Sequence, residues 1–198
     1  MKKPFRLVYY TATIISLGWC ILTVMVEING PEKSWDFGDK DARESVLIVY
    51  DPDPFYNLDE QVCLAFATVL AKQGMRVKVA SVSAAKDLEF SGFNVYVFCA
   101  NTYNWAPDWA LTRYIKEQKS LNKKPVIAVT LGSGSTRISQ KKLEQLIIRT
   151  EGRIIDSRSF WLMRPNDEAQ TKESNVQIAL SRVRNWAELL APKIMQAN

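Results

Sequence analysis

Residues 45–61 read "SVLIVYDPDPFYNLDEQ", an apolar run followed by a polar turn and the start of another pattern. The run 45–50 has the length of a buried strand, and the residues from Asn57 onward have the composition of a helix start. A strand-turn-helix unit directs free backbone N–H groups and the positive end of a helix dipole toward one point, usually a phosphate. Residues 51–57 therefore predict a turn with the geometry of an anion site.

The residues of this turn do not suit an anion. Pro52 and Pro54 have no N–H group to donate, and Asp51 and Asp53 would repel a phosphate. No Ser or Thr occurs from residue 51 to 61, and each charge-assisted hydrogen bond lost in this way costs about 1.5–3 kcal/mol. The turn thus has the position of a phosphate site and the wrong chemistry for one.

Asn57 and Glu60 have the spacing of a helix cap. Such a cap would occupy N–H groups that a phosphate needs. The donors that the sequence leaves for a rebuilt site are Tyr56, Asn57 and the N–H groups of residues 58 and 59.

Short apolar runs alternate with amphipathic stretches from residue 45 to the end of the chain. This alternation predicts an α/β fold with a doubly wound, five-stranded parallel sheet in the order 2-1-3-4-5. The expected strands are 45–50, 75–82, 94–100, 125–131 and 153–163. The expected helices are 58–73, a helix with Pro107 in its first turn, a helix capped by Ser139 that ends at Gly152, and 174–195.

In a sheet of this kind, ligands bind beyond the carboxyl ends of the strands at the switch point beside the first strand. Three loops would meet there, 51–57, 100–107 and 131–137. The second contains "NTYNW" and the third contains "LGSGS".

The three loops carry a resemblance to a known family. "VFCANTYNWAPDWALTRYI" is similar to the strand-loop-helix with which flavodoxins and related FMN reductases close over the flavin ring, and "KKPVIAVTLGSGS" resembles their Gly-rich loop on its other side. The resemblance covers residues 45 to 195 and implies FMN as the cofactor. By position, it places Thr102, Tyr103, Asn104 and Trp105 on one side of the ring and Leu131, Gly132, Ser133 and Gly134 on the other.

The first loop departs from that family. Flavodoxins have a Ser/Thr-x-Thr-Gly-Asn-Thr stretch around the FMN phosphate, where this chain has "DPDPFYN". Two functions remain open. One is electron transfer or flavin reduction with FMN. The other is a degenerate flavodoxin-like domain without flavin, acting as an interaction or accessory subunit of a membrane complex, with its aromatic loops as the docking surface.

Composition narrows the alternatives. The net charge is +5, but three basic residues precede the first acidic one and the rest carries only 23 − 21 = +2, which gives no indication of nucleic-acid binding. The chain has no histidine, so a His-based triad or His-ligated metal is excluded. The three cysteines lack metal-site spacing, and no later acidic pair supports a magnesium site at Asp51 and Asp53.

Residues 7–26, "LVYYTATIISLGWCILTVMV", contain no charge and have the length of a membrane-spanning helix. The run is longer than the core of a cleaved signal peptide and lacks a small-x-small cleavage site, so residues 1–26 are expected to be a retained single-pass anchor in membrane lipid. Lys2, Lys3 and Arg6 favour a cytoplasmic N-terminus and an extracytoplasmic domain. Residues 27–44 are expected to be a linker and 45–198 the domain, with a redox or membrane-protein partner.

Overall fold

The computed structural model describes residues 3–170 and 172–197. Lys2, one of the basic residues before the apolar run, lies outside them. The strands are β1 (Ser34–Phe37), β2 (Ser45–Tyr50), β3 (Arg76–Ser81), β4 (Val95–Tyr103), β5 (Ala106–Pro107), β6 (Pro125–Gly132) and β7 (Arg153–Trp161). The helices are α1 (Lys3–Glu27), α2 (Leu58–Lys72), α3 (Val82–Ala85), the 3-10 turn η1 (Phe90–Gly92), α4 (Trp109–Glu117), α5 (Arg137–Arg149) and α6 (Asn175–Gln196).

The sheet has the order β1-β3-β2-β4-β6-β7, and β5 pairs with β4. Five neighbouring strands of this sheet are mutually parallel, in the order β3, β2, β4, β6 and β7. This confirms the expected 2-1-3-4-5 arrangement. β2 is buried at every position, as is β4 along its first seven residues. Continuous burial is the reason that these strands read as unbroken apolar runs.

The strand count was wrong, because the sheet has seven strands and not five. β5 is a two-residue strand that turns back on β4, and β1 pairs antiparallel with β3 at the sheet edge. β1 lies inside residues 27–44, the expected linker. Its Trp35 and Phe37 pack against the core while Asp36 bonds Lys78 on β3 at 2.9 Å. Four alternating residues are too short a run to distinguish from a polar loop in sequence.

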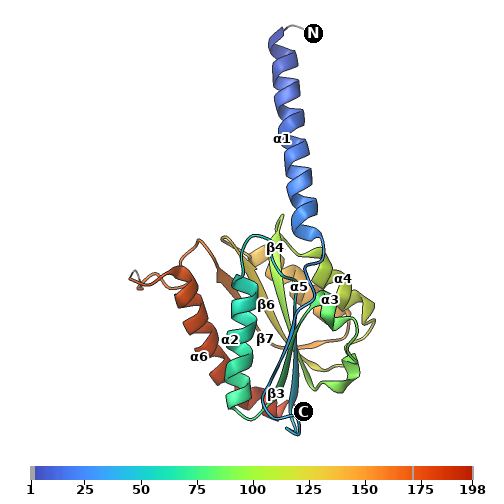
Figure 1. Cartoon of the computed structure of the whole chain (residues 1–198), viewed down its shortest axis with the longest axis vertical. Coiled ribbons are helices and arrows are strands. Elements are labelled where there is room, and N and C mark those ends of the chain that lie inside the picture. Colours follow the sequence, from blue (N-terminus) through green and yellow to red (C-terminus); the bar gives the residue numbers. More distant parts are fainter. Residues whose placement is uncertain (1–2, 171, 198) are drawn as a thin grey trace.

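Helices cover both faces of the sheet (Figure 1), α2 and α6 on one side and α3, α4 and α5 on the other. The first layer centres on Trp186, whose ring lies 5.3 Å from that of Phe66 and 6.0 Å from that of Phe160. The second layer contains Tyr96 stacked on Phe90 at 4.0 Å. Each layer is closed off from water, so the rigid sheet holds the loops at its ends in fixed positions.

Two expected helix starts were wrong. Pro107 belongs to β5, and α4 begins after Asp108, whose side chain accepts the N–H of Leu111 at 2.8 Å. Ser139 is buried inside α5, and Thr136 is the residue before that helix. Both errors come from using a single residue type as a boundary signal where tertiary contacts decide the boundary.

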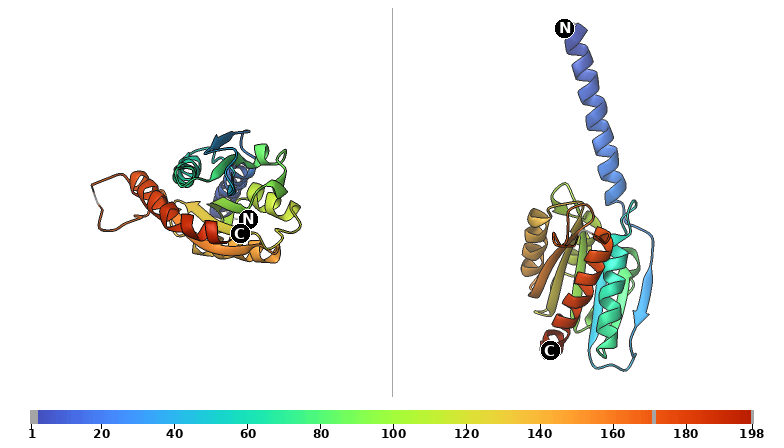
Figure 2. Two further views of the ribbon diagram at one scale, coloured as in Figure 1. Left: turned by 90° about the horizontal axis from the view of Figure 1, so that it is seen from below. Right: turned by 90° about the vertical axis from the view of Figure 1, so that its left-hand side faces the viewer.

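α1 leaves the domain at the carboxyl ends of the parallel strands and points away from it (Figures 1 and 2). Its residues from Arg6 to Glu27 are long and apolar enough to span a membrane by length and composition. The most apolar 18-residue stretch of this helix is not buried against any described residue of the domain.

Candidate functional site

The turn after β2 is closed by its own carboxylates. Asp53 Oδ1 accepts the N–H groups of Phe55 at 2.7 Å and Tyr56 at 3.0 Å. These are two of the N–H groups that a bound anion would use. The Asp53 side chain is therefore an internal substitute for a ligand at this turn.

Asp59, in the first turn of α2, accepts further donors of this turn. Its Oδ2 accepts the N–H of Asp53 at 2.6 Å and the amide of Asn101 at 3.0 Å, and its Oδ1 accepts the N–H of Glu60 at 2.7 Å. Asp59 is 1% exposed, and burial raises the pKa of this carboxyl to about 6. At neutral pH the carboxylate is charged, so a negative group already lies at the helix N-terminus.

Asp51 lies deeper, at the end of β2. Its Oδ1 accepts the N–H of Gly30 at 3.0 Å, and its carbonyl oxygen accepts the amide of Asn101 at 2.8 Å. Burial raises the pKa of Asp51 to about 6. Asp51 thus ties the segment that follows α1 to the end of the first parallel strand.

The expected cap of α2 is absent. Asn57 makes no side-chain bond to the helix N-terminus and instead accepts the side-chain amide of Gln61 at 2.6 Å. Glu60 binds Lys33 at 2.6 Å and Tyr50 at 3.2 Å. Three N–H groups of the turn, those of residues 53, 55 and 56, are withheld from a phosphate by Asp53 and Asp59 and not by a helix cap.

The hairpin β4–β5 forms the second loop. Asn104 and Trp105 have positive φ angles of 49° and 58°, as a two-residue type I′ turn requires. Asparagine tolerates this conformation, whereas tryptophan is strained in it. Tyr103 donates its hydroxyl to Asp53 at 2.6 Å and so fixes the hairpin to the first loop.

The Gly-rich third loop begins where β6 ends. A Cβ atom at Gly132 would lie 2.8 Å from Thr136 and 3.3 Å from Thr102, so the absence of a side chain lets this loop approach the β4 hairpin. A Cβ at Gly134 would meet nothing within 4 Å. Close approach to a neighbouring strand explains Gly132 without a ligand, while Gly134 faces open space.

The three loops enclose a mainly apolar cavity of about 210 Å³. Of the ten residues expected to bind a cofactor, six line it: Tyr56, Thr102, Tyr103, Leu131, Gly132 and Ser133. Asn104, Trp105 and Gly134 line a neighbouring hollow together with Trp19 of α1, and Asn57 lines neither. The Thr102 hydroxyl, at the boundary of both, is buried without a hydrogen-bond partner among the described residues.

Sequence reasoning missed several residues of the site. Asp59 and Asn101 also line the cavity, and Phe55 and Leu162 complete its apolar wall. Asn101 could have been found as the polar residue that follows an apolar strand. For Asp59 the sequence indicated only the backbone N–H as a possible donor. Its carboxylate carried no signal, because an acidic residue in the first turn of a helix is common through its interaction with the helix dipole.

Acidic groups also occupy the N-terminus of α4. Asp108 is fully buried; its Oδ2 accepts the N–H of Asn101 at 2.9 Å, and burial raises the pKa of its carboxyl. Glu27, at the end of α1, accepts the N–H of Trp109 at 2.6 Å. Carboxylates thus lie at the N-termini of both α2 and α4.

No family model and no curated protein matches the sequence. Among solved structures, rubredoxin:oxygen oxidoreductase from Desulfovibrio gigas is similar with a TM-score of 0.58 at 15% identity, over 77% of this chain and 36% of that one. A flavodoxin from the domain Archaea has a TM-score of 0.56 at 10% identity, over 76% and 99% of the two chains.

The domain has a flavodoxin-like fold. A WrbA-like flavodoxin from Agrobacterium tumefaciens agrees, with a TM-score of 0.56 at 12% identity over 78% of this chain and 99% of that one. Identities this low establish the fold of the flavodoxin-like domain and leave its ligand to be argued from its own residues.

The site suits the flavin ring of FMN but not its phosphate. The cavity and the unpaired Thr102 hydroxyl suit a flat ring with a polar edge. The cavity is smaller than the roughly 300–1,000 Å³ of sites that enclose a whole ligand. The phosphate half does not fit, because the carboxylates of Asp53 and Asp59 lie in the turn and already accept the N–H groups of residues 53, 55 and 56. Within the described residues, no group of three or more acidic or cysteine side chains could hold a metal ion.

Proposed function

We propose that the chain is a membrane-anchored accessory protein. Its flavodoxin-like domain does not bind the phosphate of FMN and acts as a binding module at the bilayer surface. The observation that carries this proposal is the Asp59 carboxylate on the N–H groups of Asp53 and Glu60. A dianionic phosphate would have to displace one charged carboxylate and lie beside another, Asp53.

The second candidate is a redox domain that holds a flavin ring without a phosphate. The cavity between Tyr103 and Leu131, with the unpaired Thr102 hydroxyl at its edge, favours it. A bound flavin would supply electron-transfer chemistry. The chain itself would contribute a rigid hairpin, tied through Tyr103 to Asp53, and an apolar wall that excludes water.

Titration of the full chain in phosphatidylcholine nanodiscs with FMN and with riboflavin separates the two, with quenching of flavin fluorescence as the measurement. Binding of neither flavin at high micromolar concentration supports the accessory role. Binding of riboflavin more tightly than FMN supports the redox role without phosphate. FMN binding at least as tight as that of riboflavin would contradict the closed phosphate position and both candidates.

The anchor in this proposal is α1. Its last turns contact the loops of the site, since Thr23 accepts the amide of Asn104 at 3.2 Å and Glu27 holds the N-terminus of α4. A bilayer around α1 therefore lies over the carboxyl end of the sheet. We define the apolar rim as six exposed side chains of the loops and helix starts at this end, Phe55, Tyr56, Trp105, Trp109, Ile138 and Met163.

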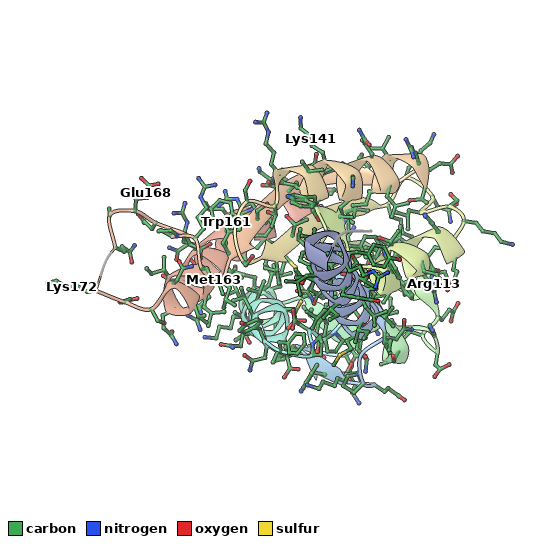
Figure 3. The ribbon with its side chains drawn as sticks, turned by 90° about the horizontal axis from the view of Figure 1, so that it is seen from above. Arg113, Lys141, Trp161, Met163, Glu168 and Lys172 are labelled. Atoms are coloured by element: carbon green, nitrogen blue, oxygen red, sulfur yellow. The ribbon has the colours of Figure 1, made fainter. Side chains whose placement is uncertain are left out.

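The apolar rim suits the lipid interface. Trp105 is 65% exposed and Met163 69%, and Trp105 shares a hollow with Trp19 of the apolar helix. Tryptophan and tyrosine are favoured at the headgroup level. Figure 3 looks along α1 onto this end and shows Met163 and Trp161 to one side of α1, toward α6, with Lys141 at the edge of the domain. The proposed site thus opens toward the membrane, where a membrane-protein partner would meet it.

The side of the membrane is part of the proposal and rests on Lys2, Lys3 and Arg6, the basic residues before the apolar run. Cysteine labelling in intact cells tests it, but needs an added cysteine. Cys63 and Cys99 are buried, and Cys20 lies within α1. Lys119→Cys, exposed in the loop after α4, should be labelled by a membrane-impermeant maleimide in intact cells. Labelling only after lysis would place the domain in the cytoplasm.

A further inference from the structure

A second, larger hollow lies at the far edge of the sheet, away from the site above. It has a volume of about 470 Å³ and is formed by β7, the start of α5, the loop after β7 and α6. Each of these four elements contributes one arginine: Arg158, Arg137, Arg164 and Arg182. The volume is within the range of small-molecule sites.

The charge of this hollow is largely unbalanced. Arg182 lies 3.7 Å from Asp167 and also donates to the carbonyl oxygen of Asn166. Arg137, Arg158 and Arg164 form no ion pair with any of the described residues. Like charges gathered around one space repel each other, so the cluster has a cost that a bound anion would remove.

Two of the guanidinium groups are held by aromatic rings. Arg164 lies 4.9 Å from the ring centre of Trp161, and Arg158 lies 5.2 Å from that of Trp186. A cation-π contact restrains a guanidinium without using its N–H groups as donors to an acceptor, and those groups can bind a phosphate in two-pronged fashion. The arginines are therefore partly oriented before any ligand arrives.

The floor of the hollow is polar and ordered. Gln140 donates to Ser157 at 2.8 Å and accepts from Ser159 at 2.8 Å, and Ser159 lies 2.7 Å from the hydroxyl of Thr130. These side chains project from the outer edge of the sheet and from the first turns of α5. Ser157 and Ser159 alternate with Arg158 along β7, so their hydroxyls lie on the α5 side of the strand, with Arg137, while Arg158 lies on the α6 side, with Arg182. The hollow therefore spans the open edge of β7.

The N-terminus of α5 adds to the attraction. Thr136 precedes this 13-residue helix but makes no side-chain cap, and its hydroxyl accepts the indole N–H of Trp161 at 3.3 Å. The first turn of α5 contains no acidic residue. Its N-terminus thus keeps its positive dipole end, in contrast to that of α2, where Asp59 takes this place.

We propose that this hollow binds a phosphate-bearing anion through Arg137, Arg158, Arg164 and Arg182. The ligand class is a phosphomonoester or pyrophosphate group with two or more negative charges, from a soluble metabolite or from the headgroup of an anionic lipid. The site is separate from the flavodoxin-like cavity, and its occupancy does not depend on whether a flavin binds there.

Isothermal titration of the full chain in phosphatidylcholine nanodiscs tests the proposal, with inorganic phosphate and pyrophosphate as probes. A second arm uses dihexanoyl phosphatidic acid, below its critical micelle concentration, against dihexanoyl phosphatidylcholine. Saturable binding of pyrophosphate assigns the site to soluble anions. Binding of the phosphatidic acid alone assigns it to a lipid headgroup.

The test variant is Arg158→Gln with Arg164→Gln, and the charge-matched control is Arg149→Gln with Arg184→Gln, two exposed arginines outside the hollow. We expect the test variant to weaken binding of the active probe at least tenfold and the control less than twofold. Equal weakening by both variants, or no saturable binding of any probe by the wild type, would overturn the proposal. Circular dichroism of each variant verifies that the fold is unchanged.

Discussion

Asp59 Oδ2 accepts the backbone N–H of Asp53 at 2.6 Å across the turn that joins β2 to α2. Asp53 in turn accepts the hydroxyl of Tyr103 at 2.6 Å from the next loop. The position that a flavodoxin-like fold offers to a phosphate is therefore part of the protein's own hydrogen-bond network.

Asp59→Asn is expected to shift ligand preference toward FMN. The substitution removes the negative charge at the N-terminus of α2 with little change of shape, so a phosphate meets less repulsion. The ratio of FMN affinity to riboflavin affinity should rise by about tenfold, or about 1.4 kcal/mol. Fluorescence titration measures both, and Asp87→Asn, at an exposed position, is the control. An unchanged ratio would mean that Asp59 does not control phosphate access.

The free energy of unfolding should rise as the pH falls from 7 toward 4. The folded-state pKa values of Asp51 and Asp59 are raised to about 6, so the folded protein takes up protons more readily than the unfolded chain. Their stabilising contribution is complete below the ordinary aspartate pKa and is lost as the pH rises through 6. The effect is on the order of 2–3 kcal/mol for each group.

Urea unfolding in detergent at several pH values measures this dependence. Asp51→Asn combined with Asp59→Asn should reduce the slope of the curve between pH 4 and 7 and leave the part that comes from Asp108, while Asp87→Asn should leave the slope intact. A double variant with the wild-type slope would assign the pH dependence to other groups.

Gly38→Ala should destabilise the domain by more than about 2 kcal/mol. Gly38 has a φ of +79°, and a Cβ there would lie 2.0 Å from the carbonyl oxygen of Met75. Both the left-handed backbone and the collision oppose a side chain. Gly92→Ala is the matched control, since a Cβ there meets nothing within 4 Å. Equal urea midpoints for the two variants would contradict a required glycine after β1.

Trp105→Gly should stabilise the protein against unfolding in detergent and weaken its contact with lipid. Glycine suits the positive φ of the type I′ turn, which should add about 0.5–1 kcal/mol to the free energy of unfolding in detergent. Brominated lipids in nanodiscs should quench wild-type tryptophan fluorescence more than that of the variant. Trp35→Phe, at the far sheet edge, is the control and should retain the quenching. Loss of stability in Trp105→Gly would show that this tryptophan supports the hairpin itself.

Much of the fold follows from local pattern. The parallel strands are apolar along their length, and the helices between them have one apolar face, so both their order and their handedness are constrained. β1 and β5 were missed, because strands of four and two residues have too few alternating positions to be recognised and depend on their partner strand. The start of α4 was misplaced because Pro107 was assigned to the first turn, whereas Asp108 caps the helix by accepting the N–H of Leu111.

The site was predicted in part. Loops at the carboxyl ends of neighbouring strands must converge, so Tyr103 and Leu131 could be placed in one cavity from the strand order alone. Asn57 was misplaced, because its side chain turns to Gln61. The arginine hollow was not foreseen, since its four arginines come from elements that are apart in sequence and meet only at β7.

The sequence by itself determined the parallel sheet, the apolar N-terminal helix and a phosphate turn with unsuitable residues, because these depend on periodicity, length and the presence or absence of N–H groups. Tertiary structure alone decided which group occupies that turn. Asp59 reaches the N–H of Asp53 only when α2 packs against β2 and Asn101 on β4 holds its carboxylate. Hydrogen bonds of this kind depend on atoms within about 3 Å, and only the folded chain brings them there.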